Sequence, residues 1–513
     1  MLLVDVATTS ASVAATRSRL AKRALLVDLL RRAHPAEAPV VARYLAGELR
    51  QRRTGLGWRS LAAMPDPAAV PSLDVLAVDA LFEQMSLLAG PGSSTARMAM
   101  AAELFGAATD VEQRLLRGLV AGDLRQGALD ALLLDAVAEA AGVPLAVVRR
   151  AAMLAGATEP VASAALGAPS PDEARAALEA FGLTVGRPVR PMLAASAPDV
   201  ATAMAGFAGR EVVVDAKLDG IRVQAHRDGD DVRVYTRSLD DVTARVPELV
   251  AVVRNLPVRT AVLDGEALAL DAEGLPRPFQ ETSARSATRD VELAAATTLS
   301  PFFFDVLHLD GHDLVDAPLR ARLAALDAVA GPHVVERVVT QDADAAQAAF
   351  AGWVAAGQEG VLIKDAEAPY EAGRRGGAWV KVKPRHTLDL VVLAVERGSG
   401  RREGLLSNIH LGARDPAGGF VMLGKTFKGM TDEMLAWQTR RFRELEVADD
   451  GWTVTLRPEQ VVEVAFDGLQ RSTRYPGGLA LRFARVLRYR DDKAAAEADT
   501  VDMVQALAPA ASR

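Results

Sequence analysis

The chain has 513 residues, 50% of them apolar and 24% charged, a composition typical of globular proteins and a length that predicts several domains. The absence of cysteine excludes disulfides, thiolate zinc sites and cysteine nucleophiles. A net charge of −7 argues against a protein that coats nucleic acid through bulk positive charge. Residues 1–10 lack the pattern of a secretory signal, and no apolar stretch could span a bilayer. We therefore expect a cytoplasmic protein without membrane contact.

Residues 1–167 are expected to form a helical domain, because apolar side chains recur there at helical spacing. One helix face is predicted to consist of Leu129, Leu132, Leu133, Ala136 and Val137. The glycine- and proline-rich segment 167–171 marks a boundary, so we predict a linker with a short helix over residues 168–186.

Short β-rich runs alternate with helices after residue 187, which predicts an α+β domain over residues 187–387. After residue 388, strands separated by glycine-rich loops predict a small β-barrel over residues 388–493, and the alanine-rich tail 494–513 is expected to end the fold loosely. The predicted strands are 211–217, 221–227, 231–237, 262–270, 302–307, 360–364, 379–383, 390–395, 409–413, 420–423 and 461–464.

The first candidate for chemistry is Lys217, in the run Asp215-Ala216-Lys217-Leu218-Asp219-Gly220. Only eight of the 59 basic residues are lysines, and an amine can act as a nucleophile whereas a guanidinium practically cannot. A lysine at a strand end, beside other cations, can lose its proton near neutral pH and attack phosphorus. The motif alone is a weak signal, because a chance match in such a chain has odds on the order of one in ten.

The two strands after Lys217 are predicted to pair as a hairpin around residues 228–231. Pairing Arg227 with Val232 places Arg222 opposite Arg237 on a polar face. Two adjacent arginines beside a candidate nucleophile suit a polyphosphate, and a solvated strand face is the alternative.

Further candidate ligands follow along the chain. Glu266 lies in a Leu-Asp-Gly-Glu run, where a carboxylate suits a ribose hydroxyl or a hydrated Mg²⁺. Phe304 ends a run of three phenylalanines, which is more typical of a plain core strand than of a base-stacking site. Glu359 precedes an apolar strand that ends at Lys364, and it supplies a second carboxylate.

Two cationic segments complete the set. Residues 379–383 alternate strictly, so Lys381 and Lys383 share one face of a predicted strand, with Arg375 just upstream; a solvated edge strand is the alternative. Residues 482–493 form the second segment, which contains Arg490 and Lys493 and would by itself be a surface strand.

In this order and spacing the segments resemble the motif set of ATP-dependent DNA ligases, within the covalent nucleotidyltransferase superfamily shared with RNA ligases and capping enzymes. The resemblance covers residues 10–493, and its motifs are K-x-D-G, D-G-E, F-F-F-D, E-G-V-L-I-K, W-V-K-V-K and R-x-D-K. It implies a multidomain fold of the bacterial three-domain type. An all-α DNA-binding domain would precede an α+β nucleotidyltransferase (adenylation) domain and a β-barrel OB-fold domain.

The resemblance also implies an activity with ATP and Mg²⁺. Lys217 would attack the α-phosphate of ATP, form lysyl-AMP and release pyrophosphate; AMP would pass to a DNA 5′-phosphate, and the 3′-hydroxyl would displace it. By the same resemblance, Asp215 and Phe304 would contact the adenine, Arg222 and Arg237 would contact a phosphate or the nucleotide, and Glu266 would bind the ribose or a metal. Glu359 would bind Mg²⁺, and the charge at the α-phosphate would be neutralised by Arg375, Lys381 and Lys383. Arg490 and Lys493 would close over the pyrophosphate. Many relatives have Glu where this chain has Asp215, which puts a side-chain contact to adenine in doubt.

The partner implied is nicked duplex DNA, bound mainly through its backbone by a monomer at the bacterial nucleoid during replication, repair or recombination. Glycine-punctuated turns at residues 51–58 and 118–127 resemble loops that grip duplex backbones, although plain interhelical turns are the alternative. Lys425 and Lys428 are expected OB-fold contacts to DNA.

Three alternatives remain at this point. An RNA ligase or capping enzyme is disfavoured by the large helical N-terminal domain, and an NAD-dependent ligase by the absence of the four cysteines that bind its zinc. A DNA-end-binding scaffold without catalysis is disfavoured because every expected catalytic residue is present.

Overall fold

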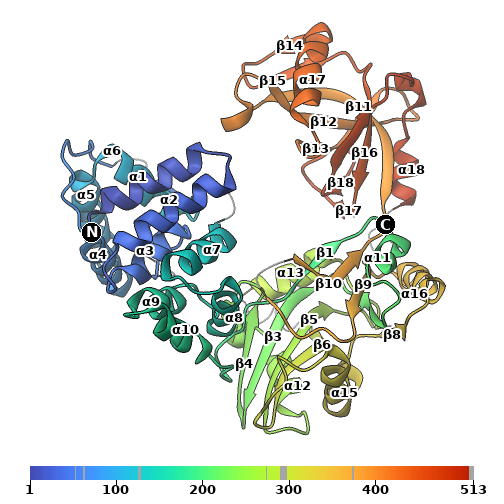
Figure 1. The fold of residues 1–513 in the computed structure, drawn as a ribbon. Coiled ribbons are helices and arrows are strands. Elements are labelled where there is room, and N and C mark those ends of the chain that lie inside the picture. The colour runs from blue at the N-terminus through green and yellow to red at the C-terminus, as the bar shows by residue number, and fades with distance from the viewer. Residues whose placement is uncertain are drawn as a thin grey trace.

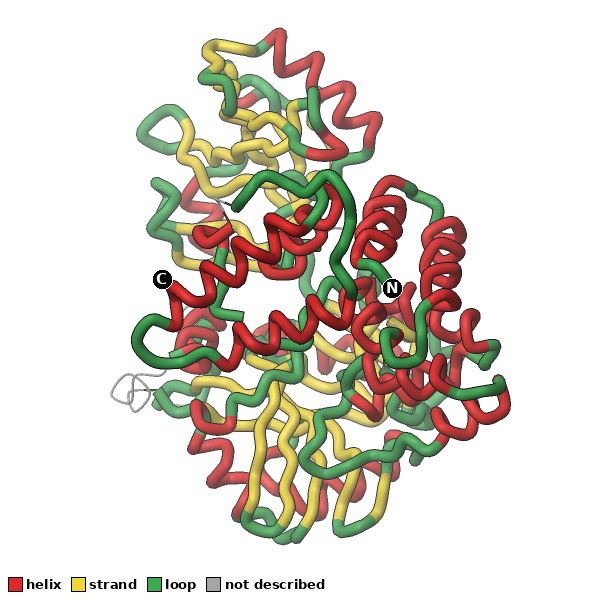
Figure 2. The backbone as a smooth tube through the Cα atoms, turned by 90° about the vertical axis from the view of Figure 1, so that its left-hand side faces the viewer, coloured by secondary structure: helices red, strands yellow, loops and turns green. Residues whose placement is uncertain are grey.

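The computed structural model describes residues 1–51, 54–61, 64–124, 129–272, 274–288, 297–372 and 375–507. These form an N-terminal helical region, a middle region of two sheets, and a C-terminal β-rich region from residue 386 onward. Figure 1 shows the three regions around an open space, with the N-terminal region on the left and the C-terminal region at the top. Figure 2 shows the strands of the middle and C-terminal regions and the helices around the N-terminus. The predicted multidomain fold with a helical beginning and a β-rich end is confirmed.

The N-terminal region is built from amphipathic helices. Leu132, Leu133, Ala136 and Val137 of the predicted helix face are all buried, which confirms that part of the prediction, and the side chain of Leu129 lies outside the described residues. In the described part of the chain, no helix is both long and apolar enough to cross a membrane. The helices are α1 Leu3–Ala15, α2 Arg19–Arg32, α3 Ala38–Leu45, α4 Val75–Leu87, α5 Ser93–Ala107, α6 Asp110–Ala121, α7 Leu129–Ala141, α8 Leu145–Ala155, α9 Glu159–Gly167 and α10 Pro171–Glu179, with a 3-10 turn η1 Trp58–Leu61.

Helix α10 falls in the segment predicted as a linker. Ser170 caps its first turn, and Pro171 occupies its first position, where a missing N–H does no harm. Its buried Ala174 and Leu178 belong to the core of the helical region. The residues that follow, 180–192, run from this helix to the first strand of the middle region.

The middle region contains two five-stranded sheets. The first has the order β1-β10-β9-β2-β8, with only β1 parallel to its neighbour, and the second has the order β4-β3-β5-β6-β7, antiparallel throughout. Their strands are β1 Leu193–Ser196, β2 Val212–Lys217, β3 Ile221–Asp228, β4 Asp231–Thr236, β5 Thr260–Ala269, β6 Leu299–Leu309, β7 His312–Asp313, β8 Arg337–Thr340, β9 Gly360–Asp365 and β10 Arg375–Val382.

Helices cover one face of each sheet. Apolar side chains of α11 Val200–Ala205 and α16 Ala343–Ala355 pack on the first sheet, and those of α12 Pro247–Arg254 and α15 Leu319–Ala330 pack on the second. Helix α13 Phe279–Ala287 lies beside β5, and the 3-10 turns are η2 Thr243–Arg245 and η3 Gly331–His333. The opposite faces of the two sheets share a smaller buried core, with Val262 and Leu307 from the second sheet and Trp379 from the first, and a cavity remains beside it.

The predicted hairpin is confirmed. Arg227 pairs with Val232, and Val223 pairs with Thr236, so the register is the one expected from the turn. Val223 and Val234 are buried in the core behind the sheet, as the period of two requires.

The C-terminal region has a seven-stranded sheet of order β13-β12-β11-β15-β14, in which β16 pairs with β11 and β19. No pairing of described residues joins β13 to β14 or β19 and closes the sheet, so the predicted β-barrel is not confirmed. Its elements are β11 His386–Arg397, β12 Leu406–Arg414, β13 Phe420–Thr426, α17 Asp432–Glu444, β14 Glu446–Asp449, β15 Thr453–Leu456, β16 Val461–Phe466, β17 Gly468–Arg471, β18 Leu479–Arg482, β19 Arg485–Tyr489 and α18 Val501–Ala506, with 3-10 turns η4 Gly400–Arg402 and η5 Ala495–Glu497.

The tail predicted to end loosely does not do so over residues 501–506. Thr500 caps α18, and Val504 is fully buried in the core of the C-terminal region. Hydrogen bonds of Asp499 with Asp389 and with the backbone N–H of Arg414, together with the burial of Val504, hold this segment on the sheet. Residues 508–513 lie outside the described part of the chain.

Candidate active site

A cavity of about 620 Å³ lies between the uncovered faces of the two middle sheets, and residues of the C-terminal region reach its mouth. On the first sheet, β9 pairs with β2 on one side and β10 on the other. Side chains two residues apart share a face, so the pocket side is built of cross-strand rows. The rows are Val213, Lys364 and Trp379, then Asp215, Leu362 and Lys381, and finally Lys217 with Gly360.

The predicted cationic strand is not an edge strand, because β10 lies between β1 and β9. Lys381 and Lys383 line the cavity with Trp379, while Val382 packs in the core behind the sheet. The predicted division of faces is confirmed. The side chain of Arg375 lies outside the described residues, although its backbone begins β10.

Gly360 allows β9 to lie close to β10 at this end of the sheet. Its φ is +139°, and a Cβ placed there would lie 2.2 Å from the carbonyl oxygen of Val382. Only a residue without a side chain permits this approach of β9 to β10. The glycine therefore brings Glu359 and Lys383, the residues flanking this contact, close to each other.

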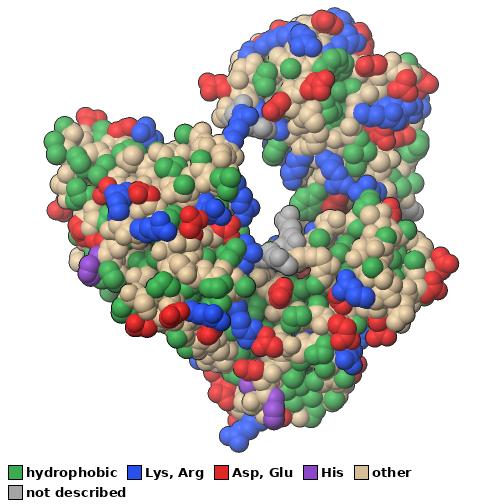
Figure 3. Space-filling view, in the orientation of Figure 1, with side chains coloured by type: hydrophobic (Ala, Val, Ile, Leu, Met, Phe, Trp, Pro, Cys, Tyr) green, Lys and Arg blue, Asp and Glu red, His purple; other side chains and the backbone are tan. Residues whose placement is uncertain are grey.

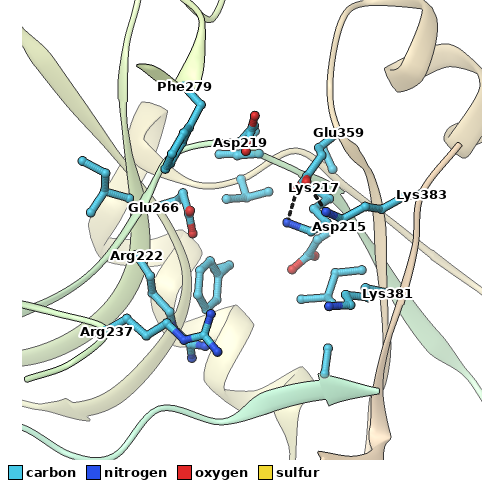
Figure 4. Close-up of a pocket in the computed structure, with 18 of the residues that line it drawn as sticks. Asp215, Lys217, Asp219, Arg222, Arg237, Glu266, Phe279, Glu359, Lys381 and Lys383 are labelled. Atoms are coloured by element: carbon cyan, nitrogen blue, oxygen red, sulfur yellow. Dashed lines mark hydrogen bonds and ion pairs between the residues drawn. The ribbon is translucent and has the colours of Figure 1, made fainter. Parts of the chain in front are cut away.

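Glu359 bridges two lysines at the end of the first sheet. One carboxylate oxygen contacts Nζ of Lys217 and the other contacts Nζ of Lys383, as the dashed lines in Figure 4 show. Burial raises the pKa of Glu359, but the charges and hydrogen bonds of the two lysines outweigh it and hold that pKa below its usual value. Glu359 is thus an anion that fixes the positions of both amines.

The opposite wall of the cavity comes from the second sheet, where Glu266 on β5 pairs directly with Arg222 on β3. Burial raises the pKa of Glu266 to about 7, against the opposing charges of Lys217 and Arg222. Near neutral pH its carboxyl group therefore serves both as a hydrogen-bond donor and as an acceptor.

Arg222 lines the cavity, but its guanidinium is already held by protein groups. Nε and Nη2 donate to the two carboxylate oxygens of Asp264 at 3.0 and 2.6 Å, and Nη1 donates to the carbonyl oxygen of Met192 at 2.6 Å. Tyr370 donates to the same carboxylate at 2.7 Å. Arg237 lines the cavity beside Arg222 with an exposed side chain (Figure 4), so the two predicted arginines do lie together.

Phe304 faces the cavity because of a β-bulge. Asp264 pairs with Asp305 and Gly265 pairs with Phe303, which leaves Phe304 without a partner on β5. Its ring packs edge-on against Trp379 at 5.9 Å. The next residue, Asp305, is fully buried and accepts two hydrogen bonds from Arg322, which anchors the bulge to α15.

Arg490 and Lys493 do not line this cavity. Both donate to the carboxylate of Asp389 on β11, at 3.0 and 2.6 Å, and Arg490 also pairs with Asp492. They lie instead beside a separate cavity that includes Trp437. In this arrangement the two cations are neutralised within the C-terminal region.

The C-terminal residues that do reach the cavity are ones that sequence analysis did not assign. Arg482 donates to Asp219 at 2.6 Å and lies 5.3 Å from the ring of Phe279. Phe483, 56% exposed, also lines the cavity, and Asp467 lies 3.7 Å from Lys383. Arg482 and Phe483 open the cationic segment recognised in the sequence, but no local pattern distinguishes them from Arg490.

The donor set fits a metal that arrives with a nucleotide rather than one held by protein alone. Among the described residues, no group of three or more His, Cys, Asp or Glu side chains could hold a metal ion. Glu266 and Glu359 both line the cavity, and Mg²⁺ commonly binds one or two carboxylates together with substrate phosphates and water.

Comparisons with known proteins agree with this geometry. Family models match residues 191–383 ("ATP dependent DNA ligase domain") and residues 402–493 ("ATP dependent DNA ligase C terminal region"). A "Probable DNA ligase" of Beutenbergia cavernae is 72% identical over 510 residues, which cover 99% of this chain and 100% of the relative. A "Probable DNA ligase" of Kineococcus radiotolerans is 63% identical over 513 residues, which cover 99% of this chain and 100% of that relative. The solved structure "Pmar-Lig_PreS3" shares the fold, with a TM-score of 0.61 at 19% identity over 94% of this chain and 99% of its own. The chain therefore belongs to the family of ATP-dependent DNA ligases, enzymes that use ATP and bind DNA.

Proposed function

We propose that this ligase seals nicks in duplex DNA through a lysyl-AMP intermediate on Lys217. The observation that carries the proposal is the contact of Lys217 Nζ with Glu359, in a cavity that Lys381 and Lys383 also line. An amine that is held by a carboxylate, with two further lysines beside it, suits attack on a phosphate whose negative charge increases during the reaction.

The first step joins Nζ of Lys217 to the α-phosphorus of ATP and breaks the bond to pyrophosphate. Lys217 gives up a proton, and Glu359 is the group in contact with it. When Lys383 turns from Glu359 to the α-phosphate, Glu359 loses one of the two cations that lower its pKa and becomes a better proton acceptor. Lys381 and, by the family resemblance, Arg375 assist Lys383.

The other walls bind the nucleoside. Phe304 stacks on the adenine, Asp215 lies against its edge and Glu266 bonds the ribose hydroxyls. Arg237, which is exposed, is available to contact a phosphate. Arg222 would contact the nucleotide from the position in which Asp264 and Tyr370 hold its guanidinium. Glu359 and Glu266 would hold a Mg²⁺, which neutralises phosphate charge when bound.

In the later steps the AMP passes to the DNA 5′-phosphate, which attacks the lysyl-AMP phosphorus and frees Lys217. The 3′-hydroxyl then attacks the activated 5′-phosphate, a phosphodiester bond forms, and AMP leaves. Adenylation of the DNA 5′-phosphate lets AMP leave from its phosphorus, whereas an unmodified 5′-phosphate would have to lose one of its own oxygens.

Nicked duplex DNA is the proposed substrate, bound by a monomer through the sugar-phosphate backbone. Figure 3 shows Lys and Arg side chains on both sides of the open space between the N-terminal and C-terminal regions. Cations distributed over several regions give affinity without sequence selection, which a general nick-sealing enzyme requires. We propose an OB-type DNA-binding role for the C-terminal region, where Lys428 lies 5.3 Å from the exposed ring of Phe483.

The C-terminal region must also move. Arg490 and Lys493 are proposed to contact the pyrophosphate during self-adenylation, yet both are paired with Asp389 away from the cavity. We therefore propose that the described arrangement serves the DNA steps, and that another arrangement presents Arg490 and Lys493 to ATP.

The test is a labelling experiment on nucleotide-stripped enzyme with Mg²⁺ and ATP labelled at the α-phosphate. Label should remain on the protein, mass spectrometry should locate AMP on Lys217, and Lys217→Ala should abolish it. Lys22→Ala, far from the cavity in sequence and in the helical region, is the matched control. Label on another residue, or none, would contradict the mechanism; no label with intact DNA binding would support the scaffold alternative.

A further inference from the structure

Residues 186–192 connect the helical region to β1, and we call this segment the strap. It lies along the polar face of β3, where alternate side chains of that strand bind its backbone. Nδ1 of His226 accepts a hydrogen bond from the N–H of Gly186 at 3.0 Å. The side-chain amide of Gln224 accepts from the N–H of Val189 at 2.7 Å and donates to its carbonyl oxygen at 3.1 Å. Part of the face that was expected to bind a polyphosphate is therefore occupied by the chain itself.

The third contact of β3 with the strap is made by Arg222, which lines the cavity. Its Nη1 donates to the carbonyl oxygen of Met192 at 2.6 Å. The N–H of Met192 donates to the hydroxyl of Tyr370 at 2.9 Å. This hydroxyl in turn donates to Asp264 at 2.7 Å and lies 3.3 Å from Nη2 of Arg222. A hydroxyl offers one donor and two acceptor positions, so the Tyr370 hydroxyl uses all of its hydrogen bonds to hold this frame together.

The frame leaves the guanidinium of Arg222 with little freedom. Of its five N–H groups, those on Nε and Nη2 are directed at Asp264 and Tyr370, and one on Nη1 bonds Met192. The second N–H on Nη1 has no partner among the residues that the structure describes. One unpaired donor suits a single phosphate oxygen rather than the bidentate binding that a free arginine offers.

The helical region holds the strap from its other side. Two residues before Met192, the N–H of Arg190 donates to the carbonyl oxygen of Met153 at 3.0 Å. The Arg190 guanidinium donates to Asp130 and to Thr158, both at 2.7 Å. These partners lie on α8, on α7 and at the start of α9. The strap is therefore fixed between the helical region and β3.

We propose that Tyr370 is a positioning residue, which aims Arg222 at one phosphate oxygen by holding Asp264 and the end of the strap. The strap is thereby part of the active site, and Arg190 gives the helical region and the cavity one common frame. The inference rests on the proposed function, since the phosphate concerned is the one bound beside Lys217. Burial raises the pKa of Tyr370, so its hydroxyl keeps the proton that it donates.

The experiment measures two single-turnover rates of the full chain: self-adenylation by α-phosphate labelling, and sealing of pre-adenylated nicked DNA. Arg222→Lys, which keeps a charge beside Asp264 but loses the planar fork, identifies the step in which Arg222 acts. Tyr370→Phe should slow that same step by about fivefold to a hundredfold, and the other step less, because small misplacements of a positioned group cost that much. An Arg222→Lys variant with both rates unchanged would overturn the inference.

Tyr235→Phe is the matched control. The Tyr235 hydroxyl donates to the carbonyl oxygen of Gly186 at 2.6 Å, so the same change removes one hydrogen bond to the same strap, at the end distant from Met192. Thermal unfolding identifies which variants fold. Tyr235→Phe should change either rate by less than about twofold. Equal slowing by the two variants would overturn the inference, because any loosening of the strap would then have the same effect.

A double-mutant cycle tests whether Tyr370 acts through Arg222. In the Arg222→Lys background, Tyr370→Phe should slow the step further by less than about twofold, because residues that act as a unit are not additive. Full multiplication of the two effects would overturn the inference. If Tyr370→Phe does not fold, Gln224→Met, which frees Val189 three residues before Met192, carries the same prediction. Failure of the wild type to take up label from ATP would overturn the proposed function instead.

Discussion

The carboxylate of Asp219 accepts a 2.6 Å hydrogen bond from Arg482, although the two residues lie 263 positions apart. Asp219 belongs to the turn after Lys217, and Arg482 ends β18 of the C-terminal region. The same guanidinium lies over Phe279 of α13. This contact ties the C-terminal region to the cavity mouth in an arrangement that leaves Arg490 and Lys493 outside.

Arg482→Ala should slow sealing of pre-adenylated nicked DNA by about tenfold or more, and slow self-adenylation less. A hydrogen bond between charged groups is worth about 1.5–3 kcal/mol, and this one joins the C-terminal region to the cavity mouth in the arrangement that we propose for the DNA steps. Single-turnover sealing and α-phosphate labelling measure the two steps. Arg488→Ala, whose partner Glu463 lies within the C-terminal region, is the control. Equal slowing of both steps by Arg482→Ala would contradict the assignment of the contact to the DNA steps.

Arg490→Ala should show the opposite pattern, with a loss of about tenfold or more in self-adenylation and a smaller loss in sealing of pre-adenylated DNA. The proposed reason is that Arg490 contacts pyrophosphate only after it leaves Asp389.

Asp389→Asn weakens the pairing that holds both Arg490 and Lys493, so it should favour their release and speed labelling at subsaturating ATP. Slower labelling in a folded Asp389→Asn variant would show that this pairing does not restrain the two cations.

Glu266 should make stability depend on pH. Its pKa is raised from 4.5 to about 7 by burial, so the folded protein binds this proton more tightly than the unfolded chain does. The contribution is fully present below pH 4.5 and is lost as pH rises to 7, by up to about 3 kcal/mol. Denaturant unfolding of wild type and Glu266→Gln at pH 4.5, 6 and 8 measures it. The stability of the wild type relative to the variant should fall across this window, and a constant or rising difference would refute the assignment.

Gly360→Ala should lower the free energy of unfolding by roughly 3 kcal/mol or more. The added Cβ would lie 2.2 Å from a backbone oxygen of β10, and the φ of +139° is unfavourable for alanine. Gly352→Ala in α16 is the matched control, because nothing lies within 4 Å of its Cβ and alanine favours a helix by about 0.5–1 kcal/mol. Calorimetry or denaturant unfolding distinguishes the two; similar stabilities would show that β9 and β10 can separate without penalty.

The sequence by itself determined the strands and their faces. Alternation with a period of two placed Lys381 with Lys383 and Arg222 with Arg237, and the turn at residues 228–231 fixed the register of the hairpin. Helical spacing identified the buried face of α7 in the same way. These features are local, since neighbouring residues along the chain decide them.

Tertiary structure decided how those faces meet. Phe304 faces the cavity through a bulge whose register depends on β5, Lys364 reaches Asp215 only because β9 lies beside β2, and Arg222 is held by Asp264 and Tyr370 from other segments. The C-terminal region presents Arg482 rather than Arg490 because its position rests on a few contacts with the cavity mouth. Pairing between distant strands and the placement of one region on another depend on packing across the whole chain, which no local pattern of residues contains.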